Sequence, residues 1–219
     1  MTTVVLSLGG SIINPKKINI KFLKKFKKLI LSRKEKFIIV CGGGKPAREY
    51  QNAAKKLGLS TKSQDKIGIT ATMLNAQLVK ELFGNKAYEK VLQEPKKTKF
   101  TKIAIAAGWK PGCSTDKNAV LWAKKNSVRK VFNLSNINNV YDKDPKKYKN
   151  AKPIKKIKWK EYMKKITNKW KPGLSTPFDP IASKLAAKLK IKAYILNGKK
   201  LERLEKALDE KKFTGTIIE

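Results

Sequence analysis

Short apolar runs alternate along the chain with longer segments in which apolar residues recur every three or four positions. Residues 37–41, Phe-Ile-Ile-Val-Cys, form a continuous apolar run that is typical of a strand buried on both faces of a sheet. Similar runs predict strands at 4–8, 102–106, 131–134, 193–196 and 214–218. The intervening segments predict helices at 19–33, 46–57, 66–83, from about 115 and at 179–190. The lysine-rich residues 142–158 are predicted to form a loop.

Strands that alternate with helices indicate an α/β protein whose sheet is mainly parallel and is covered by helices on both faces. The chain of 219 residues has room for one large domain or two closely packed lobes, and it contains no internal repeat. In a sheet of this kind, ligands bind at the carboxyl ends of the strands. The loops that follow the predicted strands are therefore where we expect a functional site.

The composition predicts a folded protein of the cytoplasm. Hydrophobic residues make up 41% of the chain, which is enough for a core. The two cysteines, Cys41 and Cys113, are too few for a disulfide framework and indicate a reducing compartment. The first residues lack the pattern of a signal peptide, and no apolar run approaches the roughly 18 to 20 residues of a membrane helix. We therefore expect no membrane association.

The strongly positive charge widens the set of functions to consider. Lysine and arginine number 52 against 16 aspartates and glutamates, a formal net charge of +36, which attracts polyanions such as nucleic acids. Nearly all of these cations are lysines spread along the chain, so we favour a composition-wide lysine bias over a dedicated nucleic-acid surface. Histidine is absent, which excludes histidine bases, Ser-His triads and histidine metal sites.

Three glycine-bearing turns, at residues 9–11, 42–44 and 108–112, follow three predicted strands and are the first candidates for a ligand site. A glycine turn that leads into a helix directs several backbone N–H groups toward one point, which suits phosphate. Any one turn also fits an ordinary tight connection, but three at the same end of one sheet favour phosphate binding. The chain has no dinucleotide G-x-G-x-x-G motif, and the Gly-Lys pair of the second turn is followed by Pro46, which excludes a P-loop.

Polar residues near these turns extend the prediction. Arg48 can reach a phosphate with two donors at once, and because arginine is rare in this chain we favour a functional role for it. Ser114, Thr115 and Asp116 fit either a phosphate site, with the aspartate orienting a lysine or a magnesium-bound water, or an ordinary helix N-cap. Lys184 supplies a cation of the kind that phosphoryl transfer needs, but its spacing alone does not distinguish it from the other lysines.

Taken in order, these motifs resemble those of the amino acid kinase superfamily and, within it, of the archaeal UMP kinases. The similarity runs from end to end of the chain. It comprises GGS at 9–11, GGGKPAR at 42–48, QDKIGITATMLNAQL at 64–78, PGCSTD at 111–116, SNINNVYDKDPKK at 135–147, FDPIASKLA at 178–186 and GTIIE at 215–219. Each motif is modest by itself, but their order and spacing are specific for the superfamily and fairly specific for the UMP kinase branch.

The resemblance implies a fold and an activity. The fold is α/β, a three-layer α/β/α sandwich with a mainly parallel central sheet, in a single domain over 1–219. Its acceptor-binding half would occupy about 1–125 and its ATP-binding half about 126–219. The implied reaction is reversible transfer of the γ-phosphate of ATP to UMP, with Mg²⁺ bound together with ATP. The implied assembly is a homohexamer.

The resemblance also implies roles for individual residues. ATP would contact Gly10, Ser11, Gly44, Arg48, Ser135, Asn136, Tyr141 and Asp144. UMP would contact Gly43, Asp65, Trp109, Lys110, Pro111, Gly112, Cys113, Ser114 and Thr115, with Asp65 on the ribose. The catalytic candidates are Arg48, Lys184 and Asp116, and no residue is expected to bind a metal ion directly.

Two segments depart from the pattern of the family. Asn138 and Asn139 stand where an aspartate and a glycine are usual, and Trp109 replaces a small hydroxyl residue of the acceptor loop. Asparagine tolerates left-handed backbone angles, so the turn can persist, but the lost carboxylate changes the charge on the ATP side. Two alternatives therefore stand beside a UMP kinase. One is a kinase of the same superfamily with another acceptor, such as carbamate or isopentenyl phosphate. The other is a nucleotide- or nucleic-acid-binding protein with little or no turnover.

Overall fold

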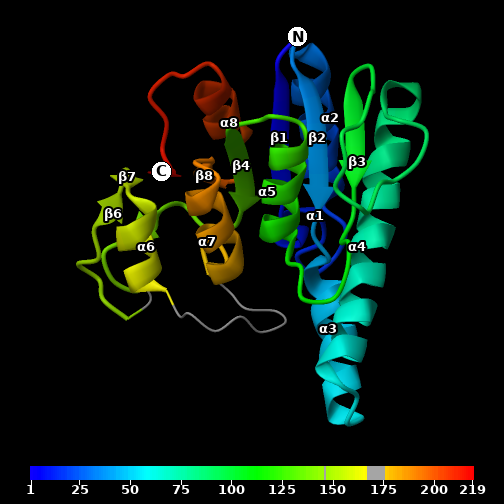
Figure 1. Ribbon diagram of the computed structural model, residues 1–219, viewed down its shortest axis with the longest axis horizontal. Helices are drawn as coiled ribbons and strands as arrows, with labels where there is room; N and C mark the ends of the chain where they lie inside the picture. The colour runs from blue at the N-terminus through cyan, green and yellow to red at the C-terminus, as the bar shows by residue number, and fades with distance from the viewer. Residues whose placement is uncertain (146, 167–175) are drawn as a thin grey trace.

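A seven-stranded sheet forms the centre of the protein (Figure 1). The computed structural model describes residues 1–145, 147–166 and 176–219. The strands follow the order β3-β2-β1-β4-β8-β9-β7 across the sheet. Their bounds are β1 Thr3–Leu8, β2 Lys36–Cys41, β3 Ile103–Ala106, β4 Lys130–Ser135, β7 Lys156–Ile157, β8 Lys192–Asn197 and β9 Thr216–Ile218.

The sheet is mainly parallel, as the sequence predicts. Strands β3, β2, β1, β4 and β8 all pair in parallel, and β9 joins β8 in the antiparallel direction. Strand β7 then pairs in parallel with β9 at the edge. Two further short strands, β5 (Val140–Tyr141) and β6 (Pro153–Ile154), form a small antiparallel sheet of their own. The carboxyl ends of β1, β2, β3 and β4 therefore point to the same edge of the main sheet.

Helices cover both faces of the sheet and complete a three-layer sandwich (Figure 1). One hydrophobic core includes α1 (Gly10–Ile13), α2 (Ile20–Ser32), α4 (Thr61–Phe83) and α8 (Leu201–Leu208). The other includes α5 (Thr115–Lys125), α6 (Trp159–Lys165) and α7 (Pro180–Lys188). Successive residues of each strand alternate between the two cores, so Phe37 packs in the first and Ile38 in the second. Helix α3 (Gly44–Lys56) packs along α4, which is followed by the 3₁₀ helix η1 (Gly84–Lys86).

The predicted strands and helices are all present, with some differences at their ends. Helix α4 begins at Thr61 rather than at residue 66, because the Ser60 hydroxyl accepts the N–H of Ser63 at 3.1 Å and caps an earlier start. Helices α6 and α8 are not among the predicted helices, although Leu201 and Leu204 have helical spacing. The predicted loop at 142–158 contains the short strands β6 and β7.

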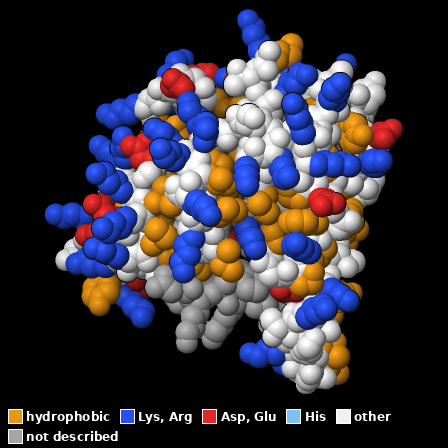
Figure 2. All heavy atoms as spheres, viewed as in Figure 1, with side chains coloured by type: hydrophobic (Ala, Val, Ile, Leu, Met, Phe, Trp, Pro, Cys, Tyr) orange, Lys and Arg blue, Asp and Glu red, His pale blue; other side chains and the backbone are white. Residues whose placement is uncertain are grey.

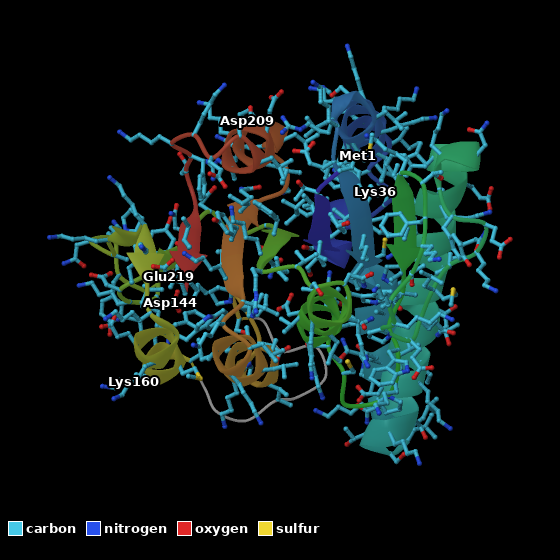
Figure 3. The ribbon with its side chains drawn as sticks, turned by 45° about the horizontal axis from the view of Figure 1, so that its top comes forward. Met1, Lys36, Asp144, Lys160, Asp209 and Glu219 are labelled. Atoms are coloured by element: carbon cyan, nitrogen blue, oxygen red, sulfur yellow. The ribbon has the colours of Figure 1, made fainter. Side chains whose placement is uncertain are left out.

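Basic side chains are distributed over the whole face shown in Figure 2, with few acidic side chains among them. This distribution agrees with a composition-wide lysine bias. Some of the scarce acids hold elements together: Glu219, labelled in Figure 3, pairs with Lys156 at 2.5 Å and with Lys192 at 2.6 Å. None of the helices in the described part of the chain is both long and apolar enough to cross a membrane.

Candidate functional site

A cavity of about 440 Å³ opens at the carboxyl ends of β1, β2, β3 and β4. All three predicted glycine turns reach it, because parallel strands bring the loops that follow them to one edge of the sheet. The predicted site residues that line it are Gly10, Ser11, Gly43, Gly44, Arg48, Asp65, Lys110, Cys113, Ser114, Thr115, Asp116, Ser135 and Asn136. The structure therefore joins most of the residues that the sequence predicts to form the site.

The first two glycine turns touch through their backbones. A Cβ atom on Gly10 would lie 1.9 Å from the backbone nitrogen of Gly44, and one on Gly42 would lie 2.6 Å from the nitrogen of Gly10. Gly44 also has a φ of +70°, a conformation that favours glycine. The N–H of Gly42 donates to the carbonyl oxygen of Leu8 at 2.9 Å and ties the second turn to the end of β1. Only glycine therefore fits where the first turn meets the second.

The same turns offer unpaired backbone donors to the cavity. Within the described residues, the N–H groups of Gly10, Ser11, Gly43 and Gly44 have no protein acceptor, and no side chain caps the start of α3. The N-terminus of this 13-residue helix adds a partial positive charge at the same place. Several convergent N–H groups and a helix N-terminus form a site that suits a phosphate group.

Two polar residues of α4 hold the glycine turns in place. The side-chain amide of Asn75 donates to the carbonyl oxygens of Gly42 at 2.8 Å and Gly43 at 3.0 Å. The Thr72 hydroxyl accepts the N–H of Gly108 at 2.7 Å. Since both α4 side chains are buried, these bonds fix the second and third turns relative to one another.

The third turn is held against the start of α4 by Asp65. Its carboxylate accepts the N–H of Gly112 at 2.8 Å, which orders the loop that carries the predicted acceptor residues. The Trp109 ring packs beneath the ammonium group of Lys110, with 4.0 Å between the nitrogen and the ring centroid. Burial raises the pKa of the Cys113 thiol to about 11, which disfavours the nucleophilic thiolate form near neutral pH.

Asp116 supplies a carboxyl group to the floor of the cavity. Its Oδ1 accepts from the Ser7 hydroxyl and from the Asn133 amide, each at 3.1 Å, and its Oδ2 accepts the N–H of Asp179 at 3.2 Å. Burial and the neighbouring charge of Asp179 raise the pKa of Asp116 to about 7, against a usual value of 3.8. This carboxyl group can therefore gain or lose a proton near neutral pH.

Asp179 links the third turn to α7. Its Oδ1 accepts the N–H groups of Ile181 at 2.7 Å and Ala182 at 3.0 Å, as an N-cap does, and its Oδ2 accepts from the Ser114 hydroxyl. Ser114 in turn accepts the N–H of Lys117 at 3.0 Å and caps α5. Of the two interpretations of Ser114, the helix cap is therefore confirmed, and because the residue also lines the cavity, the phosphate site stays a prediction.

Some predicted site residues lie outside the cavity lining: Trp109, Pro111, Gly112, Tyr141, Asp144 and Lys184. Lys184 is exposed on α7. Asp144 follows β5 and lies in the part of the protein that contains β6, β7 and α6 (Figure 3). The roles that the resemblance implies for these residues stay predictions.

Besides Gly9, Gly42 and Gly108 of the glycine turns, the cavity is lined by residues that are not among the predicted site residues: Ser7, Ala47, Gln51, Gly68, Ile69, Thr72, Asn133, Ile137, Thr176, Pro177 and Asp179. Two of them carry a signal that can be read from the sequence. Ser7 and Asn133 are polar residues inside otherwise apolar strands, and both are buried. A buried polar side chain needs a partner, and here that partner is Asp116.

The acidic residues of the cavity are few. Among the described residues, no group of three or more Cys, Asp and Glu side chains could hold a metal ion. Asp116 and Asp179 are the carboxylates at the floor of the cavity, and Asp179 already serves as a helix cap. Mg²⁺ in phosphoryl-transfer sites is held by one or two carboxylates together with substrate phosphates and water. This donor set fits a magnesium ion that enters with a phosphate ligand, with Asp116 beside it.

The raised pKa of Asp116 predicts a measurable pH dependence of stability. Because the folded pKa of about 7 exceeds the unfolded value of 3.8, this group favours the folded state most at low pH, and the contribution is lost as pH rises toward 7. Between pH 5 and pH 8 the loss is about 3 kcal/mol, at about 1.4 kcal/mol per pKa unit. The variant Asp116→Asn cannot ionise and should lack this loss. Urea denaturation of both proteins at the two pH values measures it, and equal pH slopes would contradict the assignment.

The fold and cavity together define a class of protein. A three-layer α/β sandwich with two interlocked glycine turns, open N–H groups and a buried carboxyl group at one sheet edge is the arrangement of a phosphate-transferring enzyme without a P-loop. The sequence matches the amino acid kinase family over residues 2–197, and the chain belongs to this family.

Within this family the chain is similar to uridylate kinases over its whole length. It is 34% identical to the uridylate kinase of Methanobrevibacter smithii over 222 aligned positions, which cover 98% of each chain. It is 34% identical to the uridylate kinase of Thermococcus kodakarensis over 99% of each chain. The crystal structure of uridylate kinase from Archaeoglobus fulgidus superposes with a TM-score of 0.83 at 31% identity and covers 100% of both chains.

Proposed function

We propose that this protein is a uridylate kinase, which transfers the γ-phosphate of ATP to UMP and forms ADP and UDP. The full-length similarity to archaeal uridylate kinases supports this assignment. The single observation that carries it is the composition of the cavity. The first two glycine turns, with their unpaired N–H groups, line the same cavity as the loop after β3, whose Gly112 donates to Asp65. ATP and UMP need such neighbouring anion sites, since their phosphates must lie in line for transfer.

The proposed UMP site lies in one half of the chain, whereas the proposed ATP site uses residues of both halves. The ATP phosphates would lie against Gly10, Ser11 and Gly44, and the adenosine near Ser135 and Asn136 in the half at about 126–219. UMP would lie in the half at about 1–125, with its ribose on Asp65 and its phosphate against the loop from Trp109 to Thr115. The cavity lining supports this division, because it contains residues of both groups.

The proposed mechanism is direct in-line transfer. A phosphate oxygen of UMP, already ionised at neutral pH, attacks the γ-phosphorus, and the bond to the β-γ bridging oxygen breaks to release ADP. No general base is required, which agrees with a chain that contains no histidine. Arg48 and the open N–H groups of the turns orient the phosphates and offset charge. Mg²⁺ bound with ATP would neutralise further phosphate charge. Lys184 lies outside the cavity lining, and its catalytic role, implied by the family resemblance, stays a prediction.

The proposed role of Asp116 in this mechanism is to position other groups rather than to act as a base for UMP. Its carboxyl group is held by Ser7, Asn133 and the N–H of Asp179, so it is fixed in position at the floor of the cavity. We propose that it orients the phosphate-binding groups and any magnesium-bound water. The cytoplasmic location and the homohexamer implied by the family resemblance belong to the same proposal.

A coupled ADP-release assay with Mg²⁺-ATP tests the assignment. The acceptors are UMP, CMP, dUMP, AMP, carbamate and isopentenyl phosphate, and we expect a preference for UMP of at least about 100-fold in kcat/KM. The Arg48→Ala protein, purified in parallel, controls for contaminating kinases. Turnover with a different acceptor would contradict UMP as substrate and keep the phosphotransferase class. ATP binding without ADP formation on any acceptor would favour the nucleotide-binding alternative.

A further inference from the structure

A second cavity, of about 420 Å³, lies between α8, the segment that leads into β9 and the small β5–β6 sheet. It shares no lining residue with the first cavity. Its walls carry Lys155, Lys200, Arg203, Lys206 and Lys212, against a single acid, Glu202, among the described lining residues. Five cations against one acid leave a surplus of four positive charges around one hollow.

The charges of these five cations are not balanced by acidic side chains in the described part of the chain. Among the described residues, none of the five forms an ion pair with an aspartate or a glutamate. Ion pairs do form elsewhere in the described part of the chain, as between Arg33 and both Glu35 and Asp209 at 2.7 Å each, but acidic residues are scarce, so it is the gathering of the five cations around one cavity that is specific. A concave surface lined by unbalanced charge of one sign concentrates its field and attracts ions of the opposite sign.

Asn138 positions the Arg203 guanidinium group without neutralising it. Nη1 of Arg203 donates to Oδ1 of Asn138 at 2.9 Å, and the side-chain amide of Asn197 donates to the same oxygen at 3.0 Å. The aspartate that the similar family motif carries here would place a negative charge beside the guanidinium group. Asparagine keeps the hydrogen bond and leaves the charge and the remaining donors of Arg203 for a ligand.

The opposite wall of this cavity is also held in place. The side-chain amide of Asn139 donates to the carbonyl oxygen of Gly215 at 2.6 Å, and the N–H of Val140 donates to the Thr216 hydroxyl at 2.8 Å. Both bonds are buried, so the segment that leads into β9 is fixed to the loop after β4. A cavity with walls already in position loses less conformational entropy when a ligand binds.

We propose that this second cavity binds a small anion with several linked phosphate groups, such as a triphosphate. Lys200, Arg203 and Lys206 span about 9 Å along the axis of α8 at 1.5 Å per residue, which is longer than one phosphate covers. Lys155 and Lys212 face the same hollow from its other walls. The volume is that of a small-molecule pocket rather than of a nucleic-acid groove. The proposal does not depend on kinase activity.

Isothermal titration calorimetry with inorganic tripolyphosphate tests the proposal. At about 0.15 M salt the Debye length is about 8 Å, so contacts are retained while the long-range field is screened. We expect the double variant Arg203→Gln/Lys206→Gln to bind one equivalent of tripolyphosphate fewer than the parent, or to bind that equivalent at least about tenfold more weakly. The matched control is Lys24→Gln/Lys28→Gln on α2, which removes the same charge from exposed lysines and should bind like the parent.

A single substitution gives an independent test. Asn138→Asp places a carboxylate beside Arg203 and should weaken tripolyphosphate binding about tenfold, whereas Asn85→Asp, an equal charge change at an exposed position, should not. Equal effects of the test and control variants would overturn the proposal and assign binding to the overall charge. If the Arg203→Gln/Lys206→Gln variant lost as much affinity for a short RNA as for tripolyphosphate, the proposal would be overturned in favour of a nucleic-acid surface.

Discussion

Replacing Gly10 with alanine is expected to abolish phosphate transfer and to destabilise the fold by roughly 3 kcal/mol. The added Cβ would lie 1.9 Å from the backbone nitrogen of Gly44 and 2.6 Å from its Cα. Neither turn can retreat, because β1 and β2 are paired in register up to Leu8 and Cys41, where the two turns begin. The two turns must therefore move apart, and their unpaired N–H groups then no longer converge on one phosphate group.

Two measurements on Gly10→Ala check this expectation. Urea denaturation gives the loss of stability, and the coupled assay with saturating UMP gives kcat/KM for ATP, which should fall at least about 1000-fold. Gly58→Ala is the matched control: Gly58 has a φ of +74° in a turn outside the cavity, with nothing within 4 Å of an added Cβ. It should cost about 1 kcal/mol and leave turnover unchanged. Parent-like kinetics of Gly10→Ala would contradict the interlocked turns as the phosphate site.

Arg48→Ala is expected to lower kcat/KM about 1000-fold with little change in stability. Arg48, the fifth residue of α3, lines the cavity, is exposed, and forms no ion pair with the described residues. Its guanidinium fork can hold two phosphate oxygens, and it offsets charge as the phosphoryl group passes between nucleotides. Because the side chain is exposed and packs against no core, its loss should change the free energy of unfolding by about 0.5 kcal/mol or less.

The same helix provides a control for the loss of charge. Lys45 lies in the same turn of α3 but pairs with Glu49 at 3.1 Å and does not line the cavity. Lys45→Ala should therefore keep turnover within a few-fold of the parent, whereas Arg48→Lys should restore only part of it, since lysine lacks the planar fork. Equal losses for Lys45→Ala and Arg48→Ala would assign the effect to overall charge and remove Arg48 from the catalytic group.

The glycine turns show how much of the site the sequence can predict. Each turn follows an apolar run, and parallel strands place such loops at one edge of the sheet, so their convergence follows from the pattern alone. The sequence could not predict that the first two turns touch through their backbones. That contact depends on the register of β1 against β2 and on the conformation of Gly44.

The carboxyl group of Asp116 shows where sequence reasoning ends. Its position after the third turn indicates a functional residue, but the sequence leaves a helix cap equally open. Its raised pKa depends on burial and on Asp179, which is 63 positions away along the chain. Ser7, 109 positions away, completes its hydrogen bonds. Electrostatic effects of this kind arise only from distances in space.

The sequence by itself determined the α/β class, the mainly parallel sheet and the edge where the cavity opens, and it predicts phosphate binding at the glycine turns. These follow from local patterns, since apolar periodicity and glycine placement act within a few residues of the chain. Only the tertiary structure decided which side chains share the cavity, that Lys184 lies outside its lining, and that five cations from three segments surround a second cavity. Those properties depend on packing and charge between residues that are distant in sequence, and no local pattern specifies them.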